Sequence, residues 1–488
     1  MSIVIMIAQL LLGLGLLVFV HELGHFVAAR IFHIRVPKFY LFFNPGISLM
    51  RCKRINGKWH FKFFADNLPD MEEQKDENGE PVLDKNGKKK YKIIDINTLP
   101  EGDWRKYPDN TEYGIGWLPL GGYCQIAGMI DETQSVENLA SEPQPWEYRS
   151  KPAWQRLIVI LAGVIVNLIV GVLLFAMVIH HYEKVYVPNS AVTDGVYAFE
   201  SARNMGFESG DKIVSVNGKT FERFEDAVSP KMFFGSIVTV NRNGQNMDIV
   251  MGDSAYDIMK TSSGQFLQPF NFPAKIDSVI ANTAAAKAGM KAGDVIIALD
   301  TICIPSYGAW IEYRTAYAES STTITYLRGT DTITGPITLD TAAMIGIAIA
   351  AAPYKVQPYS ILQSVKYGWN DAMSNLWMNI KGFGKIFSGK EKITALSGPV
   401  GIAQIYGKVW NWYRFWYITG LISVILAFMN VLPIPGLDGG HAIFTLVELI
   451  TGKKVPDSVL QYAQTIGMIL LLLLMVFVIG NDIFKLFM

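Results

Sequence analysis

Four long apolar runs divide the sequence into membrane-like and polar parts. They cover residues 3–20, 157–179, 416–432 and 466–479. Gln9 is the only strongly polar side chain in the first run, and Asn167 is the only one in the second. A helix that crosses a bilayer needs about 20 predominantly apolar residues. The pattern therefore predicts a polytopic α-helical membrane protein with four transmembrane helices.

Strand-like patterns follow the first apolar run. The segments 36–43, 47–54 and 59–64 are rich in aromatic and aliphatic residues, and Asn-Pro-Gly and Asn-Gly turns separate them. We expect a β-hairpin region, within residues 36–150, that associates with the membrane. Residues 65–113 are polar and of mixed charge, which predicts a solvated hairpin or loop inserted into this region.

A duplicated pattern lies between the second and third runs. Residues 206–218 and 289–300 both read Gly-x-x-x-Gly-Asp followed by alternating apolar positions and an Asn or Asp. A Gly-Asp pair suits a turn, and the alternation suits a strand. The duplication resembles the PDZ fold and predicts two PDZ-like α+β domains, at 185–256 and 262–342. PDZ domains bind a peptide end as an added strand, and the alternative is a pair of structural β-domains without a peptide ligand.

Residues 355–412 form a linker in which large apolar side chains recur near helical spacing. Trp369, Trp377, Ile380 and Phe383 follow this spacing, and lysines accompany them. The segment predicts an amphipathic helix. It would either lie on the outer membrane surface or pack against the β-domains.

Charge sets the expected orientation. The chain has 43 basic and 43 acidic residues, so no nucleic acid or other acidic polymer is indicated as a partner. Basic residues follow the first run, precede the second and separate the third from the fourth. Such residues favour the cytoplasmic side, which places the N-terminus and the duplicated domains outside and 36–150 inside. The three cysteines are widely spaced and indicate no disulfide framework.

The candidate chemistry begins where the first run ends, at His21-Glu-Leu-Gly-His25. On a helix, residues i and i+4 share one face, so His21 and His25 can hold one Zn²⁺ with Glu22 beside it as general acid/base. Such polar groups at a membrane helix end are costly unless they have partners, and zinc would partner all three. The motif also lies where a signal peptide would be cleaved, so we interpret the first run as a retained helix.

A zinc site of this kind needs a third protein ligand. The acidic residues Asp66, Glu72 and Glu73 follow the motif in sequence but lie in the polar insert. The stronger candidate is Asp438, because Pro433 and Pro435 favour extended backbone just before it, at membrane depth. The alternative is that Asp438 only caps a helix over 441–450.

These motifs together resemble the site-2 protease family of intramembrane zinc metalloproteases, and within it the bacterial type that regulates sigma-E. The resemblance rests on HELGH in the first helix, Asn430-x-x-Pro433-x-Pro435-x-x-Asp438-Gly in a late one and the tandem PDZ-like domains. It implies that His21, His25 and Asp438 bind zinc and that Glu22 is the general acid/base. It also implies that Asn430, Pro433 and Pro435 hold the substrate extended.

The resemblance implies a multi-pass protease of the inner membrane with its active site near the cytoplasmic side. Its substrates would be single-span membrane proteins already shortened by another protease, such as an anti-sigma factor or a remnant signal peptide. The PDZ-like domains would filter substrates by size or read new peptide ends. Two other functions stay open: a PDZ-based membrane scaffold with an inert zinc site, and a membrane metalloprotease that degrades misfolded proteins.

Overall fold

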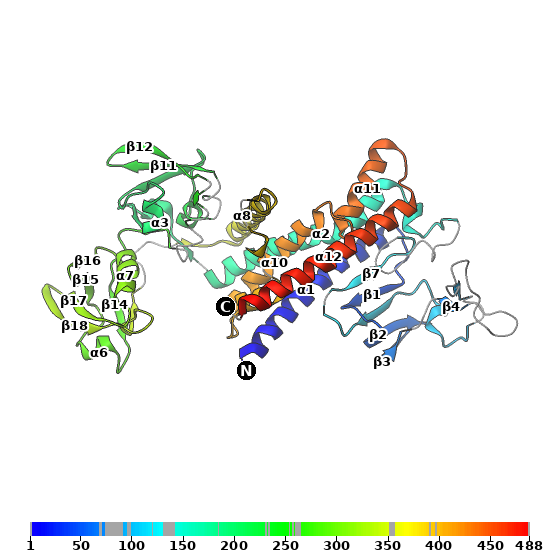
Figure 1. The fold of residues 1–488 in the computed structure, drawn as a ribbon, viewed down its shortest axis with the longest axis horizontal. Coiled ribbons are helices and arrows are strands. Elements are labelled where there is room, and N and C mark those ends of the chain that lie inside the picture. The colour runs from blue at the N-terminus through cyan, green and yellow to red at the C-terminus, as the bar shows by residue number, and fades with distance from the viewer. Residues whose placement is uncertain are drawn as a thin grey trace. The chain divides into compact units, whose positions relative to one another are not determined.

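The computed structural model describes most of the chain (Figure 1). The described residues are 2–67, 71–73, 91–94, 99–119, 121–129, 142–183, 185–229, 232, 235–252, 254–255, 258, 265–350, 357–389, 392–395 and 398–486. They form two compact units. The first contains Met1–Val178 with Val365–Met488, and the second contains Ile179–Ser364.

The first unit is built on long apolar helices. Among the described residues, four helices are long and apolar enough to cross a membrane, which confirms the predicted number. They are α1 (Ser2–Ile31), α2 (Ala153–Val178), α10 (Trp412–Val431) and α12 (Asp457–Leu486). α1 is longer than the apolar run that predicts it, because the HELGH motif continues the same helix without a break.

Glycines bring α2 unusually close to its neighbours. A Cβ atom at Gly24 on α1 would lie 2.6 Å from the carbonyl oxygen of Ala162 on α2. On another face of α2, a Cβ atom at Gly171 would lie 2.7 Å from the Val424 side chain on α10. Small residues allow such close helix packing inside a membrane, where van der Waals contact replaces the hydrophobic effect. α2 is therefore the central helix of this unit.

The other helices of the first unit are α8 (Ile361–Phe387), most of which belongs to this unit, α9 (Pro399–Tyr406) and α11 (Asp438–Thr451). α9 packs against both α1 and α12. Gln9 of α1 donates a hydrogen bond of 3.0 Å to the Gly407 carbonyl oxygen at the end of α9. At the other end of α9, the buried Asp482 of α12 accepts the backbone N–H groups of Gly398 and Gly401 at 3.1 and 2.9 Å. Both buried polar side chains therefore satisfy helix ends that lie at membrane depth.

α8 has the predicted amphipathic character. Ala372 is fully buried against α2 and α10, and a Cβ atom at Gly368 would lie within 2.9 Å of Ala176 on α2. Trp369 and Trp377 are more than half exposed. The buried face thus packs on apolar helices of the first unit.

A five-stranded sheet follows α1, in the order β3-β2-β6-β1-β7. The strands are β1 (Lys38–Leu41), β2 (Ile47–Ile55), β3 (Lys58–Asp66), β6 (Glu112–Ile115) and β7 (Tyr123–Gln125). β2 and β3 form the predicted hairpin across Asn56 and Gly57, both at positive φ. β1 does not pair with β2, because β6 lies between them and runs parallel to β1. Local patterns predict the strands but not this pairing across about seventy residues.

The aromatic residues of β3 face outward. Trp59, Phe61 and Phe63 alternate along the strand, and each is more than half exposed. An exposed apolar row of this kind marks a surface for a partner or for lipid. In the polar insert, β4 (Met71–Glu73) pairs antiparallel with β5 (Tyr91–Ile93), as in the hairpin alternative. The residues between these two strands lie outside the described part of the chain.

The second unit contains two hydrophobic cores. Around the first core lie β8 (Val185–Tyr186), β9 (Val196–Ala198), α3 (Glu200–Arg203), β10 (Lys212–Val216), α4 (Phe224–Ala227), β11 (Ile237–Arg242), β12 (Gln245–Val250) and β13 (Leu267–Pro269). Around the second lie β14 (Ile276–Val279), α6 (Ala284–Lys287), β15 (Val295–Leu299), β16 (Ile302–Cys303), α7 (Tyr307–Arg314), β17 (Ser321–Arg328), β18 (Asp331–Thr338) and β19 (Ile347–Ile349). β20 (Gln357–Pro358) returns to pair with β8.

The duplicated Gly-Asp pattern has the same structure in both halves of this unit. Gly210 and Gly293 have φ of 101° and 92°, and a strand begins two residues later in each case. The buried Asp211 accepts from Arg242 at 2.7 Å, and the buried Asp294 accepts from Arg328 at 2.8 and 2.9 Å. The arginine of the neighbouring strand thus secures the turn in both halves.

The Asp294–Arg328 pair makes the second half sensitive to acid. The Arg328 guanidinium, hydrogen-bonded to Asp294, holds the pKa of that carboxyl below its usual range. Since the folded pKa lies below the unfolded value of about 3.9, the stabilisation is complete above that value and is lost as pH falls through the folded pKa. We expect Asp294→Asn to lower the free energy of opening of β15 and β17 by about 2 kcal/mol and to remove this pH dependence.

Amide hydrogen exchange of the full-length protein would measure this effect strand by strand. Asp211→Asn is the matched control, because it should weaken β10 and β11 and leave β15 and β17 unchanged. Equal protection of β15 in the parent and in Asp294→Asn would contradict the prediction.

Candidate metal centre

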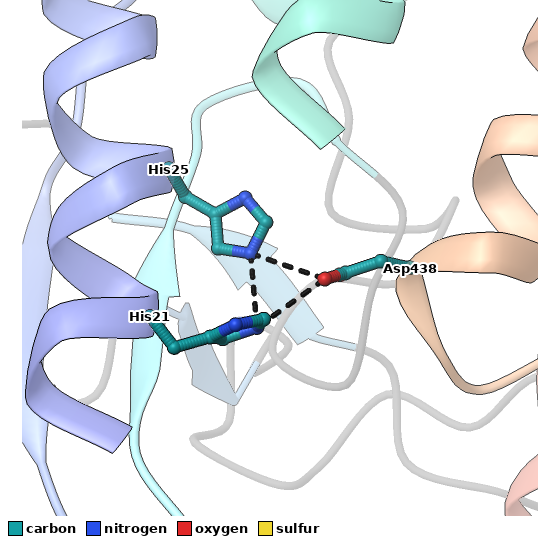
Figure 2. Close-up of side chains that lie close together, drawn as sticks. All are labelled: His21, His25 and Asp438. Carbon is teal, nitrogen blue, oxygen red and sulfur yellow. Dashed lines mark hydrogen bonds and ion pairs between the residues drawn. The ribbon is translucent and has the colours of Figure 1, made fainter. Parts of the chain in front are cut away.

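Two histidines of α1 and one aspartate of α11 converge between the membrane helices (Figure 2). His21 and His25 are one helical turn apart, so their imidazole rings project from the same face of α1. The two Nε2 atoms are 3.2 Å apart. Asp438 Oδ2 lies 3.2 Å from Nε2 of His21 and 3.4 Å from Nε2 of His25. No other group of three or more His, Cys, Asp or Glu in the described residues is arranged to hold a metal ion.

The backbone before Asp438 is unwound, as the prolines predict. α10 ends at Val431 and α11 begins at Asp438. Gly439 and Gly440 pack so closely on the connecting segment that Cβ atoms there would lie 2.2 Å from the Leu432 carbonyl oxygen and 2.6 Å from that of Ile434. Asp438 is the first residue of α11, and Leu437 occupies the N-cap position. Asp438 therefore does not stand at the capping position itself.

The three ligand atoms form a triangle of the size that zinc requires. Zn²⁺ binds nitrogen and oxygen at about 2.0–2.1 Å with tetrahedral geometry, which places neighbouring ligand atoms about 3.3 Å apart. The three edges here are 3.2, 3.2 and 3.4 Å. Three protein ligands leave the fourth tetrahedral position open, as in catalytic zinc sites rather than structural ones.

The partner of His25 sets the ring in the form that binds metal. Its Nδ1 lies 2.8 Å from the carbonyl oxygen of Val159 on α2. Because a carbonyl oxygen can only accept, Nδ1 carries the proton and donates it. Nε2 then keeps a lone pair that faces His21 and Asp438.

Asn167 orients the ring of His21 through a hydrogen bond to its Nδ1, as the Val159 carbonyl does for His25. Its side-chain amide lies 3.2 Å from Nδ1 of His21, and its Oδ1 has no hydrogen-bond partner among the described residues. The nitrogen and oxygen of an amide are distinguished only by their hydrogen bonds. With the oxygen toward the ring, it accepts from Nδ1, and His21 Nε2 is also left with its lone pair. This orientation satisfies the buried Oδ1.

Asp438 completes the fit. Its Oδ2 is buried and accepts no hydrogen bond from the described residues, although it faces two imidazole nitrogens. The Nε2 lone pairs of His21 and His25 and the Asp438 oxygen are all acceptors, and no proton lies between them. Buried acceptors that meet in this way are costly unless a cation binds them. The residues present therefore fit a zinc ion.

Gly163 of α2 lies directly against the two histidine rings. A Cβ atom there would lie 2.5 Å from Nε2 of His25 and 2.8 Å from Cε1 of His21. The α2 backbone thus forms a wall directly against both rings. α11 is held to α2 in turn by an ion pair between Arg156 and Glu448.

Two more polar groups border the site. The Glu22 carboxylate accepts a hydrogen bond from the backbone of Cys124 in β7, the edge strand of the sheet. The side-chain amide of Asn430, in the last turn of α10, lies 3.2 Å from Nε2 of His21. Glu22 and Asn430 therefore flank the three ligand atoms.

Of the residues named from sequence, His21, His25, Asp438 and Asn430 meet at one place, and Glu22 borders it. Pro433 and Pro435 lie in the unwound segment. Pro435 packs on α12, where a Cβ atom at Gly467 would lie 1.6 Å from the Pro435 carbonyl oxygen. Asp66 does not belong to the described metal cluster, and the side chains of Glu72 and Glu73 lie outside the described part of the chain.

Sequence reasoning did not assign Asn167, Val159 or Gly163 to the site. Asn167 carries a signal, because it is the only polar side chain in the second apolar run. Val159 acts through its carbonyl group, for which no side-chain pattern exists.

Comparison with known proteins agrees with this geometry. The family model for peptidase family M50 matches residues 9–77 and 104–474. The chain belongs to this family, the site-2 proteases, and is a membrane zinc metalloprotease.

Its full-length relatives include regulators of sigma E protease. The protein of that name from Haemophilus influenzae is 26% identical over 100% of both chains, and RseP of Salmonella typhimurium is likewise 26% identical over 100% of both. A putative zinc metalloprotease of Neisseria meningitidis is 28% identical over 77% of this chain and 88% of its own.

The close approach of Gly163 generates a test of the site. We expect Gly163→Ala to displace both rings and to lower the zinc content of the purified protein at least about tenfold, since a Cβ atom cannot share this space. Gly382→Ala on α8 is the matched control, because no atom lies within 4 Å of the added methyl group. Full zinc occupancy in Gly163→Ala, measured by elemental analysis, would contradict the prediction.

Proposed function

We propose that this protease cleaves a peptide bond in or near the transmembrane segment of a single-span membrane protein, with zinc held by His21, His25 and Asp438. The observation that carries the proposal is the tetrahedral-sized triangle of ligand atoms at the broken end of a membrane helix. Polar side chains between helices that are apolar enough to span a bilayer are costly, and they mark a site that works within the membrane.

The chain's own residues have distinct tasks in this reaction. Zinc, when bound, polarises the peptide carbonyl and makes water acidic enough to lose a proton near neutral pH. Glu22 accepts that proton and later donates it to the leaving amine. Its hydrogen bond from Cys124 keeps the carboxylate beside the ligand triangle. Asn430 offers an amide N–H to the reacting carbonyl region.

A membrane helix must unwind before it can be cut, because its carbonyl groups are shielded by their own hydrogen bonds. The unwound backbone then needs new partners in a place without water. β7 forms an edge of the sheet, and its Cys124 donates a backbone hydrogen bond to Glu22. We propose that the substrate pairs with this edge as an added strand.

The substrate class and topology follow from the resemblance to regulators of sigma E protease. We infer a multi-pass protein of the inner membrane, with the metal centre near the cytoplasmic face and the second unit in the periplasm. The substrates would be membrane proteins already shortened by another protease, such as an anti-sigma factor or a remnant signal peptide. The two Gly-Asp modules would then act as PDZ domains that exclude bulky substrates or read new chain ends.

Two variants separate the proposed roles of base and ligand. We expect Glu22→Gln to retain zinc and to lose at least about a hundredfold in cleavage rate, because an amide cannot accept a proton. Asp438→Ala should lose both zinc and activity, since it removes one of three ligands. Zinc content and cleavage of a single-span substrate would be measured side by side in membranes. Parent-like cleavage by Glu22→Gln would disprove its role, and full zinc occupancy in Asp438→Ala would disprove the ligand.

The filter role of the second unit has a structurally defined test. β8 pairs with β20, with Tyr186 opposite Gln357, so the ends of a deletion of 187–356 are neighbours that a short glycine linker can join. We expect this variant to cut a shortened substrate as the parent does and to cut the full-length substrate as well. Variant and parent would be compared on long and short forms of one membrane protein. A variant that binds zinc but cuts neither form would show that the second unit delivers substrate instead.

A further inference from the structure

A basic pocket lies where α1 leaves the membrane, away from the three ligand residues. It has a volume of about 280 Å³ and is lined by Arg30, His33, Ile34, Arg35, Asp109 and Trp146. The end of α1 is closed by a hydrogen bond of 2.8 Å from Ile34 N–H to the Ala29 carbonyl oxygen, across His33 at a φ of 57°. This helix-ending turn fixes Arg30 on the last helical turn and Arg35 just beyond it.

Arg35 is held rigidly in the pocket. Its backbone N–H donates to the Trp146 carbonyl oxygen, and its own carbonyl oxygen accepts from Ala127, both at 3.0 Å. Its guanidinium lies 4.4 Å from the centre of the Trp146 ring. Its Nε is buried and has no hydrogen-bond partner among the described residues. A guanidinium group that is held in this way in the wall of a pocket is preorganised to bind an anion from outside the chain.

The local charge favours an anion. Arg35 pairs through Nη2 with Asp109 at 2.5 Å, but the Asp109 side chain is 77% exposed and can turn into water. Arg30 is exposed and makes no ion pair with any residue that the structure describes. Two guanidinium groups and one carboxylate therefore line the pocket, together with His33.

The position of the pocket at the end of the membrane span indicates which anion would be available to bind there. The membrane span of α1 ends at Ile31, one residue after Arg30. Trp146 and Trp154 are 38% and 49% exposed, and Trp154 packs its ring on Phe32 just beyond the span. Exposed tryptophans at the end of a span lie at the level of lipid headgroups. Arginine forks match the oxygen atoms of a phosphate group.

We propose that this pocket is a phosphate-binding site for the headgroup of an anionic phospholipid. Arg35 contacts the phosphate oxygens with the Nη2 that Asp109 releases, and Arg30 adds a second positive charge. The same chemistry would accept inorganic phosphate from the solvent, so the experiment has an arm for each source. The proposal concerns binding alone and does not depend on the reaction at the metal centre.

The lipid arm uses the full-length protein in nanodiscs of phosphatidylcholine with a minor fraction of spin-labelled phosphatidylglycerol. Electron paramagnetic resonance then gives the motionally restricted fraction of the label, compared with labelled phosphatidylcholine. We expect the parent to select phosphatidylglycerol and Arg35→Gln to lower this selectivity about tenfold, as the loss of one charge-assisted hydrogen bond would. Arg30→Gln should lower it less, because Arg30 is exposed, and Asp109→Asn should raise it.

Lys453→Gln is the matched control, because it removes an exposed positive charge in the loop between α11 and α12, outside the pocket. Asp109→Asn and Arg30→Gln test the proposal even if Arg35→Gln fails to fold, since neither of them removes a buried contact. The second arm is calorimetric titration of inorganic phosphate into the detergent-solubilised protein. Arg35-dependent heat without selectivity for phosphatidylglycerol would assign the site to soluble phosphate. The proposal is overturned if neither probe binds, or if Arg35→Gln and Lys453→Gln reduce selectivity equally.

Discussion

The metal centre depends on one constraint, which is that every polar group at membrane depth must find its partner inside the protein. Two imidazoles and a carboxylate would be costly among apolar helices, and a zinc ion compensates all three. The outward-facing nitrogens of the rings are compensated by Val159 and Asn167 of α2. The close packing of α2 follows from this need. Gly163 brings the α2 backbone against both rings, where any side chain would displace them.

The same constraint accounts for the irregular parts of the first unit. The segment between α10 and α11 is unwound, yet it is enclosed by Gly439 and Gly440 on one side and by Gly467 of α12 on the other. Asp482 and Gln9 satisfy the two ends of α9 in a similar way. Non-helical backbone is tolerated within a membrane only where protein surrounds it or where it lines a cavity. The unwound segment meets that condition and at the same time delivers Asp438 to α1.

The sheet next to α1 connects catalysis with recognition. Its edge strand β7 contacts Glu22 through Cys124, so a substrate strand added there would pass directly beside the proposed base. The opposite edge, β3, carries an exposed row of aromatic side chains that suits lipid contact. The basic pocket around Arg35 lies on the same polypeptide segment that leads from α1 into β1. One end of α1 thus combines a reactive centre, a strand edge and a proposed lipid contact.

The sequence by itself determined the parts whose signals are local. Apolar runs specify four membrane helices, HELGH predicts two ligands and a base on one helix, and the Gly-Asp repeat specifies two turns of the same structure. The prolines before Asp438 predict unwound backbone because a proline acts on its immediate neighbour. Only the tertiary structure decided which distant groups meet. It placed β6 between β1 and β2, brought Asp438 to His21 and His25, and placed the Val159 carbonyl and the Gly163 backbone against the two rings. These contacts depend on packing between segments far apart in the sequence, and a backbone carbonyl or a missing side chain leaves no pattern in a sequence.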